Sequence, residues 1–476
     1  MREHFDLVVV GAGPAGEKAA AQAAYFGKSV AVVEQSPNPG GAAVTNAGIP
    51  TKTLRETALY VTGFRQRDVY GLSLELAPDE ALSALRARTQ DVVNTMIEHV
   101  RRNLAKHHVR LIRGRATLEG DQRVAVDSPT GERAALTADV ILLAPGSRPL
   151  RPAEIPFDDA DVHDSETILE VDKPFRSLVV MGAGPIGCEF ASIFTALGID
   201  VTVLDQQQTP LRFLDSEISS AFKRIQTELG VTFRLSSGRA SVRRDDGRLV
   251  VMLPSGEDIP TDKVLFAAGR IGNTANLGLE EVGVDVNERG HVIVDGSFQT
   301  TVPGIYAAGD VLGPPGLASV SMEQGRVAAC RAFDLSFKET VDPLYPIGIY
   351  AIPEIGAVGL SEEAATAKGI DYETGRCWFR SNTRAIISGT SEGLLKLVFR
   401  RDDRRLLGVH VIGDIAAELI HEGQAVLHHG GTIDYFIHST PNVPTHTEAY
   451  KYAAYDGLQR LTAESAPTKS DARITQ

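Results

Sequence analysis

The sequence predicts an α/β protein with two dinucleotide-binding units and a C-terminal α+β domain. Three observations support this prediction. A strand, a glycine-rich turn, a helix and a second strand ending in an acid occur twice, at residues 7–34 and 177–205. Residues 394–413 alternate apolar and polar side chains around a charged turn, as a β-hairpin does. At 476 residues the chain has room for about three domains.

Composition excludes several other classes. The chain is 43% hydrophobic and 23% charged, as expected for a globular protein and unlike a disordered one. A net charge of −13 repels phosphate backbones and anionic membranes. The three cysteines form neither a CxxC pair nor a metal-ligand cluster, and no apolar run reaches the roughly 20 residues that span a bilayer. We therefore expect a cytoplasmic protein with no nucleic-acid or membrane partner and no metal.

The two repeats have the same spacing throughout. Each has a GxGxxG turn, a glycine that ends the helix 11 residues later, and an acid 23 residues after the first glycine. In the first copy these are Gly11, Gly13, Gly16, Gly27 and Glu34; in the second they are Gly182, Gly184, Gly187, Gly198 and Asp205. One such turn can serve packing alone. Two in register predict two Rossmann-like units that each bind a dinucleotide.

The chemistry explains these residue types. The first glycine forms the tight turn, the second lets the backbone approach a pyrophosphate, and the third lets the helix pack close to the strand. The N–H groups and partial positive charge of the helix N-terminus then bind the anion. The acid that follows accepts hydrogen bonds from the adenosine ribose.

A later segment distinguishes the two sites. The stretch TTVPGIYAAGD, residues 300–310, resembles the second flavin motif of the glutathione reductase and dihydrolipoamide dehydrogenase superfamily, the class I pyridine nucleotide-disulfide oxidoreductases. That resemblance implies FAD at the first unit, with Asp310 bound to the ribityl chain and Gly41, Gly146 and Ala318 also in the flavin site. The alternative for Asp310 is a helix N-cap.

The resemblance also implies the domain order. LLAPGSRP (142–149) and FAAGRIGNT (266–274), which contains Gly269, are similar to the crossings where such chains leave and re-enter the flavin domain. The expected domains are a glutathione reductase-like, three-layer ββα flavin domain (1–152 and 273–343), an NAD(P)-binding domain (153–272), a C-terminal dimerisation domain (344–463) and a flexible tail (464–476). A homodimer is implied.

The expected redox disulfide is missing. Members of the superfamily carry GGxCxxxxCxPSK, whereas this chain has GGAAVTNAGIPTK, with Ala43 and Gly48 at the cysteine positions. Near the C-terminus the superfamily has HxHPTxxE, and here Val443 takes the place of the acid/base histidine. The joint loss of the cysteine pair and of the acid/base histidine is consistent, because neither would function without the other. His446 is expected to be a surface or cap residue.

A charged pair remains. Lys52 and Glu189 match a lysine and a glutamate that pair beside flavin N5 in the superfamily, where they stabilise reduced flavin and seat the nicotinamide. By that resemblance both are catalytic. The alternatives are a surface lysine and an acid that the helix dipole favours in the first turn.

Within the superfamily the chain resembles the soluble pyridine nucleotide transhydrogenases, through GGxxxxxxxIPxK, GRxGNT, YAxGDVxGxPxLAS and PTxxEAYxxAAxxGLxRL. These enzymes transfer hydride between NADPH and NAD through FAD. One segment departs: in DQQQ, Gln207 stands where relatives carry arginine, and Asp205 replaces a neutral residue. A carboxylate about 4 Å from a 2′-phosphate costs on the order of 4 kcal/mol at an effective dielectric of 20 and about 1 kcal/mol in bulk water. NADP should therefore bind less well than NAD.

Three functions are compatible with these observations. The first is an FAD-dependent NAD(P) transhydrogenase with NAD and NADP as substrates. The second is an NADH-dependent diaphorase or quinone reductase, which also needs no dithiol and would suit Asp205. The third is a non-catalytic flavoprotein redox sensor, against which the intact Lys52, Glu189 and Asp310 argue.

Overall fold

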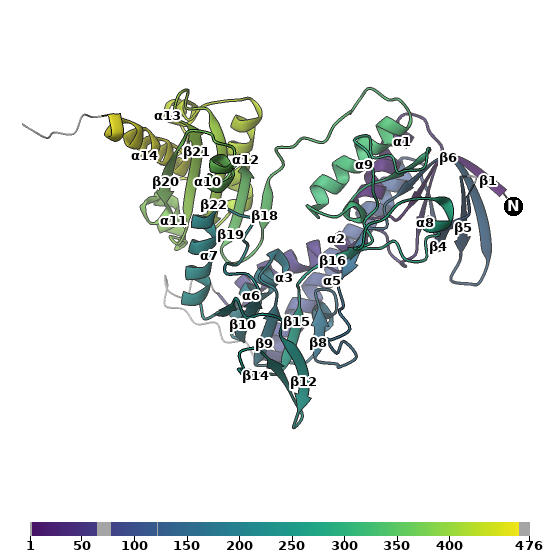
Figure 1. Cartoon of the computed structure of the whole chain (residues 1–476), viewed down its shortest axis with the longest axis horizontal. Helices are drawn as coiled ribbons and strands as arrows, with labels where there is room; N and C mark the ends of the chain where they lie inside the picture. Colours follow the sequence, from purple (N-terminus) through teal and green to yellow (C-terminus); the bar gives the residue numbers. More distant parts are fainter. Residues whose placement is uncertain (1, 64–77, 121, 466–476) are drawn as a thin grey trace, which may run out of the picture.

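The computed structural model describes residues 2–63, 78–120 and 122–465, whose strands form three sheets of five or more strands and two smaller ones. Figure 1 shows the N-terminal and C-terminal sheets in two upper lobes, with the second nucleotide unit below them. The predicted fold class is confirmed: two α/β units of parallel strands and helices precede a C-terminal α+β unit.

The first sheet is built around β1 (Arg2–Val10), which pairs in parallel with β2 (Val30–Glu34) and β6 (Arg133–Leu143). Its residues Leu7 to Val10 are buried, which explains their continuous apolar run. The remaining strands of this sheet are β3 (Arg110–Arg113), β4 (Arg115–Leu118), β5 (Arg123–Asp127) and β17 (Ile305–Ala307). Because β17 pairs with β6, the chain returns to its first sheet after completing the second.

Helix α1 (Pro14–Tyr25) follows β1 directly, with proline at its first position, where the missing N–H costs no hydrogen bond. It packs closely on α9 (Ala318–Ala332), since a Cβ on Gly325 would overlap the backbone oxygen of Ala15. The other helices of this unit are α2 (Gly41–Thr45), α3 (Gly48–Val61), α5 (Pro78–Lys106), α8 (Leu279–Val282) and the 3₁₀ turn η2 (Asp310–Leu312).

The second sheet repeats this arrangement. Strand β9 (Ser177–Met181) lies between β10 (Asp200–Asp205) and β15 (Lys263–Phe266), all parallel, with β11 (Thr232–Leu235) and β8 (Val162–Asp164) at the edges. A small antiparallel sheet covers it, formed by β12 (Ser241–Asp245), β13 (Arg248–Met252) and β14 (Asp258–Thr261). The helices are α6 (Pro185–Ala196), α7 (Ser216–Glu228) and the 3₁₀ turn η1 (Thr167–Glu170).

The two crossing segments lie side by side. Strands β7 (Ser147–Pro149) and β16 (Arg270–Gly272) pair antiparallel, and the flanking backbone adds hydrogen bonds from Leu150 to Gly269 and from Asn273 to Gly146, each 3.0 Å. Both passages between the two nucleotide units therefore run through one two-stranded ribbon.

The C-terminal unit is an antiparallel sheet with the order β18 (Ile347–Ile349), β19 (Glu354–Gly359), β22 (Leu406–Gly413), β21 (Leu394–Arg400), β20 (Tyr372–Trp378). The predicted hairpin is confirmed as β21 and β22. Its helices are α10 (Glu362–Ala367), α11 (Thr383–Ser388), α12 (Ala416–His428), α13 (Asp434–His438), α14 (Glu448–Ser465) and the 3₁₀ turn η3 (Phe379–Ser381). Residues 464–465 of the expected tail are helical, and 466–476 lie outside the described residues.

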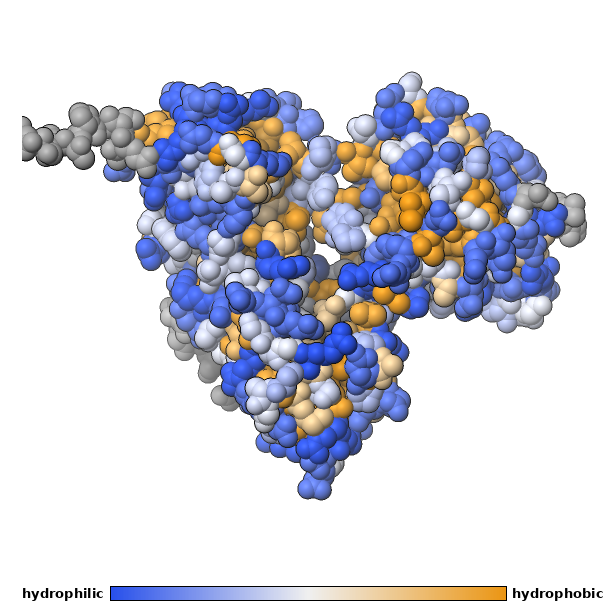
Figure 2. Space-filling view, viewed as in Figure 1, coloured by the Kyte–Doolittle hydropathy of each residue, from blue (hydrophilic) through white to orange (hydrophobic). Residues whose placement is uncertain are grey.

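Each unit has a buried apolar core, and the core of the second unit continues into β18, β19 and β22 of the C-terminal sheet. Figure 2 shows a mostly hydrophilic surface that is hollowed between the two upper lobes. The C-terminal unit is thus packed on the second nucleotide unit and faces the first across this hollow.

Candidate active site

The first glycine-rich turn has the geometry that its glycines predict. Gly11 has φ +104°, a conformation that side chains other than glycine avoid, and a Cβ on Gly16 would overlap the carbonyl oxygen of Gly11. Glu34 accepts hydrogen bonds from the backbone N–H of Ala12 at 2.8 Å and of Ser36 at 2.8 Å. The acid at the end of the second strand therefore fixes the turn and lies beside it.

The second turn repeats this geometry. Gly182 has φ +120°, and a Cβ on Gly187 would overlap the carbonyl oxygen of Gly182. Asp205 accepts hydrogen bonds from the N–H of Ala183 at 2.6 Å and of Gln207 at 2.8 Å. Asp205 thus makes the same two backbone contacts as Glu34 does in the first turn, so the two repeats are structurally equivalent.

Both turns fit a dinucleotide. The N-caps of α1 and α6 are Gly13 and Gly184, both extended and without a side-chain cap, so the helix N–H groups are not covered by a capping side chain. A Cβ on Gly184 would meet no atom within 4 Å. A Cβ on Gly13 would lie 3.8 Å from the Cα of Gly41, at an ordinary contact distance. A phosphate can approach such backbone N–H groups closely.

Asp310 begins η2, which two residues separate from β17, and serines from two other elements contact it. Its carboxylate accepts hydrogen bonds from Ser147 Oγ of β7 and Ser321 Oγ of α9, each 3.2 Å. Arg270 in turn donates to Ser147 Oγ at 2.8 Å. Ala318 is the first residue of α9 and Gly146 precedes Ser147, so the predicted residues 146, 310 and 318 come together here.

Lys52 and Glu189 form an ion pair, with Nζ 2.7 Å from Oε2. Lys52 lies on α3 of the first unit and Glu189 on α6 of the second. The Glu189 side chain is 8% exposed and that of Lys52 34%, so the pair lies at the edge of the interior. Contact between residues 137 positions apart argues against two unrelated surface charges.

Tyr350 of the C-terminal unit contacts both members of this pair. The backbone N–H of Tyr350 donates to Glu189 Oε1 at 2.9 Å, and the Tyr350 ring lies 5.0 Å from Lys52 Nζ, within cation–π range. Nearby, Arg55 of α3 donates to the carbonyl of Ala351 at 2.9 Å. Tyr350 was not predicted from the sequence, because it contributes a backbone N–H and no motif assigned to the site contains it.

The positions of the missing cysteines lie next to each other. A Cβ on Gly48 would be 3.0 Å from the carbonyl oxygen and 3.4 Å from the Cα of Ala43, so the two positions are in close contact. The three cysteines present are all buried and unpaired: Cys188, Cys330 and Cys377. Burial raises the pKa of each thiol, which suppresses the thiolate needed for exchange.

A polar contact joins this segment to Arg270, which contacts Ser147 beside Asp310. Asn46 donates to Glu166 Oε2 at 2.9 Å, and Arg270 lies 3.5 Å from the other oxygen of that carboxylate. Burial is the main cause that raises the pKa of Glu166. Neither Asn46 nor Glu166 had been predicted, since an isolated polar residue in a loop carries no pattern.

The expectation for His446 was wrong. It lies two residues before α14 but is buried, with its ring 5.5 Å from that of Phe379, and burial lowers its pKa. Val443, by contrast, is 71% exposed. Glu448 accepts a hydrogen bond from the N–H of Thr445 at 3.2 Å and so holds the turn that enters the helix.

Two negative findings concern the described residues. Within 2–63, 78–120 and 122–465, no group of three or more histidine, cysteine or acidic side chains could hold a metal ion. None of the helices in that part of the chain is long and apolar enough to cross a membrane.

Fold and site together define a protein that binds two dinucleotides on two α/β units and joins them through an ion pair. A family model described as pyridine nucleotide-disulphide oxidoreductase matches residues 5–325, and the dimerisation domain of the same family matches residues 345–454. The chain belongs to the pyridine nucleotide-disulphide oxidoreductase family.

Relatives and solved structures agree with this assignment. The chain is 43% identical over 464 residues to a soluble pyridine nucleotide transhydrogenase of Mycobacterium bovis (strain BCG / Pasteur 1173P2), covering 97% of this chain and 99% of the relative. It is 40% identical over 465 residues to one of Pseudomonas putida (strain W619), covering 96% and 99%. The structure of LpdA from Mycobacterium tuberculosis superposes with a TM-score of 0.87 at 27% identity, covering 95% of this chain and 99% of that one.

Proposed function

We propose that this chain is an FAD-dependent transhydrogenase that transfers hydride between NADPH and NAD. The observation that carries the proposal is the Lys52–Glu189 ion pair between two dinucleotide turns, in a chain that lacks a cysteine pair. Similarity at 40–43% identity to proteins named soluble pyridine nucleotide transhydrogenase supports it.

The first unit would hold FAD. Gly11, Gly13, Gly16 and Gly41 would surround the pyrophosphate, and Glu34 would accept from the adenosine ribose. Asp310 would accept hydrogen bonds from the ribityl hydroxyls. The hydrogen bonds from Ser147 and Ser321 would orient its carboxylate for this role. Gly146 and Ala318 would line the same site. The second unit would hold the nicotinamide dinucleotide through Gly182, Gly184, Gly187 and Asp205, with Gly269 in the adjoining crossing.

Bound FAD would supply the hydride carrier between the two nicotinamides. Lys52 would place its positive charge where negative charge develops on reduction, which lowers the energy of the charged state. Glu189 would hold Lys52 Nζ in place, and the Tyr350 N–H would fix the Glu189 carboxylate. Without a dithiol, the chain would have no protein electron carrier beyond the flavin, and Val443 stands where the acid/base group for such a dithiol would be.

The same proposal includes the domain limits and the assembly. The flavin domain would comprise 1–152 and 273–343, the nucleotide domain 153–272 and the dimerisation domain 344–463. A homodimer agrees with the match to the family's dimerisation domain. We propose a cytoplasmic location because the three cysteines are unpaired, and no nucleic-acid partner because the net charge of −13 repels phosphate backbones.

A second candidate is an NADH-dependent quinone reductase of the same fold. It is favoured by Asp205, whose carboxylate accepts a hydrogen bond from the N–H of Ala183 in the glycine-rich turn and would repel a 2′-phosphate bound there. One stopped-flow experiment separates the two candidates. The rate of flavin reduction is measured with NADH and NADPH, and the rate of reoxidation with NAD, NADP and a quinone.

The transhydrogenase proposal expects yellow protein with one FAD per chain, reduction by NADPH, and reoxidation by NAD at a comparable rate. Reoxidation by the quinone alone would replace it with the second candidate. Colourless protein that stays colourless after FAD addition would contradict both and leave only a role without flavin chemistry.

A further inference from the structure

The segment that joins β18 to β19, residues 350–353, contacts both nucleotide units. On the side of the second unit, the N–H of Tyr350 donates to Glu189 Oε1 at 2.9 Å. The N–H of Ile352 donates to Ser192 Oγ at 3.2 Å. Glu189 and Ser192 both belong to α6, so two backbone hydrogen bonds tie this segment to that helix.

Arg55 of α3, in the first unit, binds the same segment. Its Nε donates to the carbonyl of Ala351 at 2.9 Å, and its Nη1 lies 3.1 Å from Glu354 Oε1. The other oxygen of Glu354 accepts a hydrogen bond from the N–H of Ala417 at 3.1 Å, in the first turn of α12. The side chains of Arg55 and Glu354 are only 3% and 10% exposed. Arg55 therefore holds the segment at two points, one on its backbone and one on the first residue of β19.

The contacts of Arg55 and Lys52 form a closed ring. The two residues lie three positions apart on α3, so their side chains leave the helix on the same face. Lys52 is connected to Tyr350 through Glu189, and Arg55 is connected directly to the next residue, Ala351. If the segment moved relative to α3, the carboxylate of Glu189 could not keep both Lys52 Nζ and the Tyr350 N–H. The bond from Arg55 to Ala351 fixes that separation.

We infer that Arg55 is a positioning residue for the Lys52–Glu189 pair. By fixing the backbone of residues 350–351, it sets where the Tyr350 N–H meets Glu189 and thereby where Lys52 Nζ lies. Arg55 is buried and bound to protein groups, so it acts through the pair and not on a nucleotide. The inference rests on the proposed function only in that a nicotinamide reduces a flavin beside Lys52.

A competing role for Arg55 is to stabilise the contact between the units. Buried ion pairs often add little stability, because the desolvation of two charges offsets their attraction. The two roles differ in how the effects of Arg55 and Lys52 combine. A residue that acts only through Lys52 has no further effect on the flavin once Lys52 has been replaced, whereas a stabilising residue has the same effect with or without it.

The experiment is a double-mutant cycle on the FAD-loaded protein, with Lys52→Met, Arg55→Met and the two together. It measures the single-turnover rate of flavin reduction by NADPH and by NADH, and the midpoint potential of the flavin. Arg55→Met should slow reduction by about tenfold and make the potential more negative, because the Lys52 cation is no longer held where negative charge develops. In the Lys52→Met protein, the same substitution should slow reduction by less than about twofold and leave the potential unchanged. Arg55→Lys should recover part of the rate.

Two further variants separate positioning from misfolding. Arg55→Met leaves Glu354 buried without its cation, so Arg55→Met with Glu354→Gln replaces it in the cycle if the single variant does not retain FAD. Arg401→Met is the matched control. Arg401 also donates to a backbone carbonyl, that of Tyr372 at 2.8 Å, and pairs with a glutamate, Glu373, at 2.6 Å within the C-terminal unit. This variant should keep the wild-type rate and potential.

Equal slowing by Arg55→Met with and without Lys52, or an unchanged rate and potential when Lys52 is present, would overturn the inference. So would loss of FAD from both Arg55 variants, since this outcome identifies support of the fold as the role. The proposed function is tested separately by wild-type hydride transfer from NADPH to NAD. If that transfer is absent while NADH reduces the flavin, the function fails, and the cycle measured with NADH still decides the role of Arg55.

Discussion

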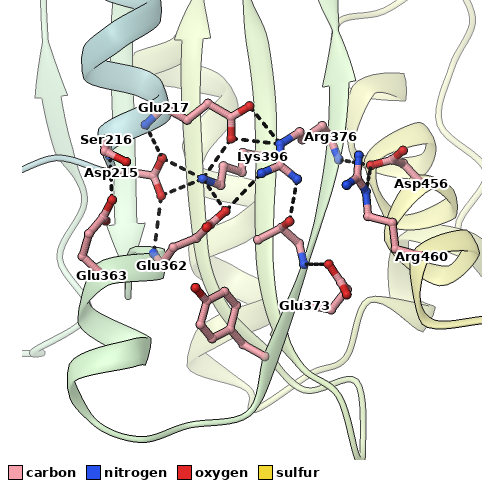
Figure 3. A network of polar contacts seen from close by, with 12 residues as sticks. Asp215, Ser216, Glu217, Glu362, Glu363, Glu373, Arg376, Lys396, Asp456 and Arg460 are labelled. Carbon is pink, nitrogen blue, oxygen red and sulfur yellow. Dashed lines mark hydrogen bonds and ion pairs between the residues drawn. The ribbon is translucent and has the colours of Figure 1, made fainter. Parts of the chain in front are cut away.

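Lys396 and Asp215 form a buried ion pair that joins the C-terminal sheet to the second nucleotide unit, with side chains only 2% and 0% exposed. Glu217 and Glu362 also lie within 3.0 Å of Lys396 Nζ, and Arg376 contacts both of these acids (Figure 3). Removing a buried charge from water is costly, so the loss of one member of this network would leave its partner as an uncompensated buried charge.

Replacing Lys396 with methionine should lower the free energy of unfolding by about 3–5 kcal/mol, because it leaves Asp215 buried without its cation. Urea denaturation followed by circular dichroism and flavin fluorescence measures this loss. Arg224→Met is the control: Arg224 pairs with Glu228 and Glu392 at the surface, so its loss should cost less than about 1 kcal/mol. A similar small loss for Lys396→Met would show that the buried pair contributes little.

His163 predicts an acid-sensitive step in stability. Burial is the main cause that lowers its pKa to about 4, and the nearby Lys263 adds to this, while Asp159, Asp161 and Asp164 oppose it. A depressed pKa means that the unfolded chain binds the proton first. The contribution of neutral His163 is therefore present above the unfolded pKa of about 6.5 and is lost as the pH falls toward 4.

His163→Gln should remove this step. Between pH 7 and pH 4.5 the wild type should lose on the order of 1–3 kcal/mol more than the variant, measured by urea denaturation at each pH. Parallel losses in the two proteins would assign the acid sensitivity to other groups, among them His410, whose pKa burial also lowers.

Lys52→Met should slow flavin reduction by NADPH by about tenfold or more. It should change nucleotide affinity little, because Lys52 belongs to the first unit and contacts Glu189, whereas Asp205 belongs to the second glycine-rich turn. Glu189→Gln should act in the same direction. The double variant should be less than additive if the two side chains act as one unit. Fully additive losses, seen in single-turnover kinetics, would separate their roles.

Asp205→Asn should favour NADPH over NADH. The amide oxygen keeps an acceptor for only one of the two backbone N–H groups, that of Ala183 or that of Gln207, and the side chain no longer repels a phosphate. A swing of about tenfold in the ratio of kcat/KM values is expected, which is roughly 1.4 kcal/mol for a partly screened charge. An unchanged ratio in the variant would mean that the carboxylate serves the turn alone.

Removing all three cysteines should leave hydride transfer unchanged. Cys188, Cys330 and Cys377 are buried, and no pair of them forms a disulfide. The variant with three alanines is assayed for NADPH-to-NAD transfer and for reduction of lipoamide and glutathione disulfide. Neither protein should show disulfide turnover or a thiolate-to-flavin charge-transfer band; disulfide turnover lost with the cysteines would reveal a thiol relay.

Much of this architecture is readable from the sequence, because the repeats obey local rules. Gly11, Gly16 and their counterparts are fixed by steric limits inside a short turn, so a spacing of a few residues predicts them. The hairpin of β21 and β22 is equally local. The Lys52–Glu189 contact is not local, and only similarity to a known family indicated it.

The missed residues share a different property. Tyr350 contributes its backbone N–H, which no side-chain pattern reveals, and Asn46 contacts Glu166 from 120 positions away in the chain. His446 was misplaced for a related reason: its burial comes from packing against Phe379, a residue on a distant segment. Tertiary contacts of this kind override local preference.

The hydrogen bond from Tyr350 to Glu189 also bears on the order in which the protein becomes active during its synthesis. Both nucleotide units precede Tyr350 in the chain, so each has been translated before the group that fixes Glu189 emerges from the ribosome. A nascent chain that stops before β18 would contain both glycine-rich turns and Lys52 with Glu189, but not the third partner. Glu189 therefore gains its hydrogen bond from Tyr350 only after the chain beyond β18 has been made.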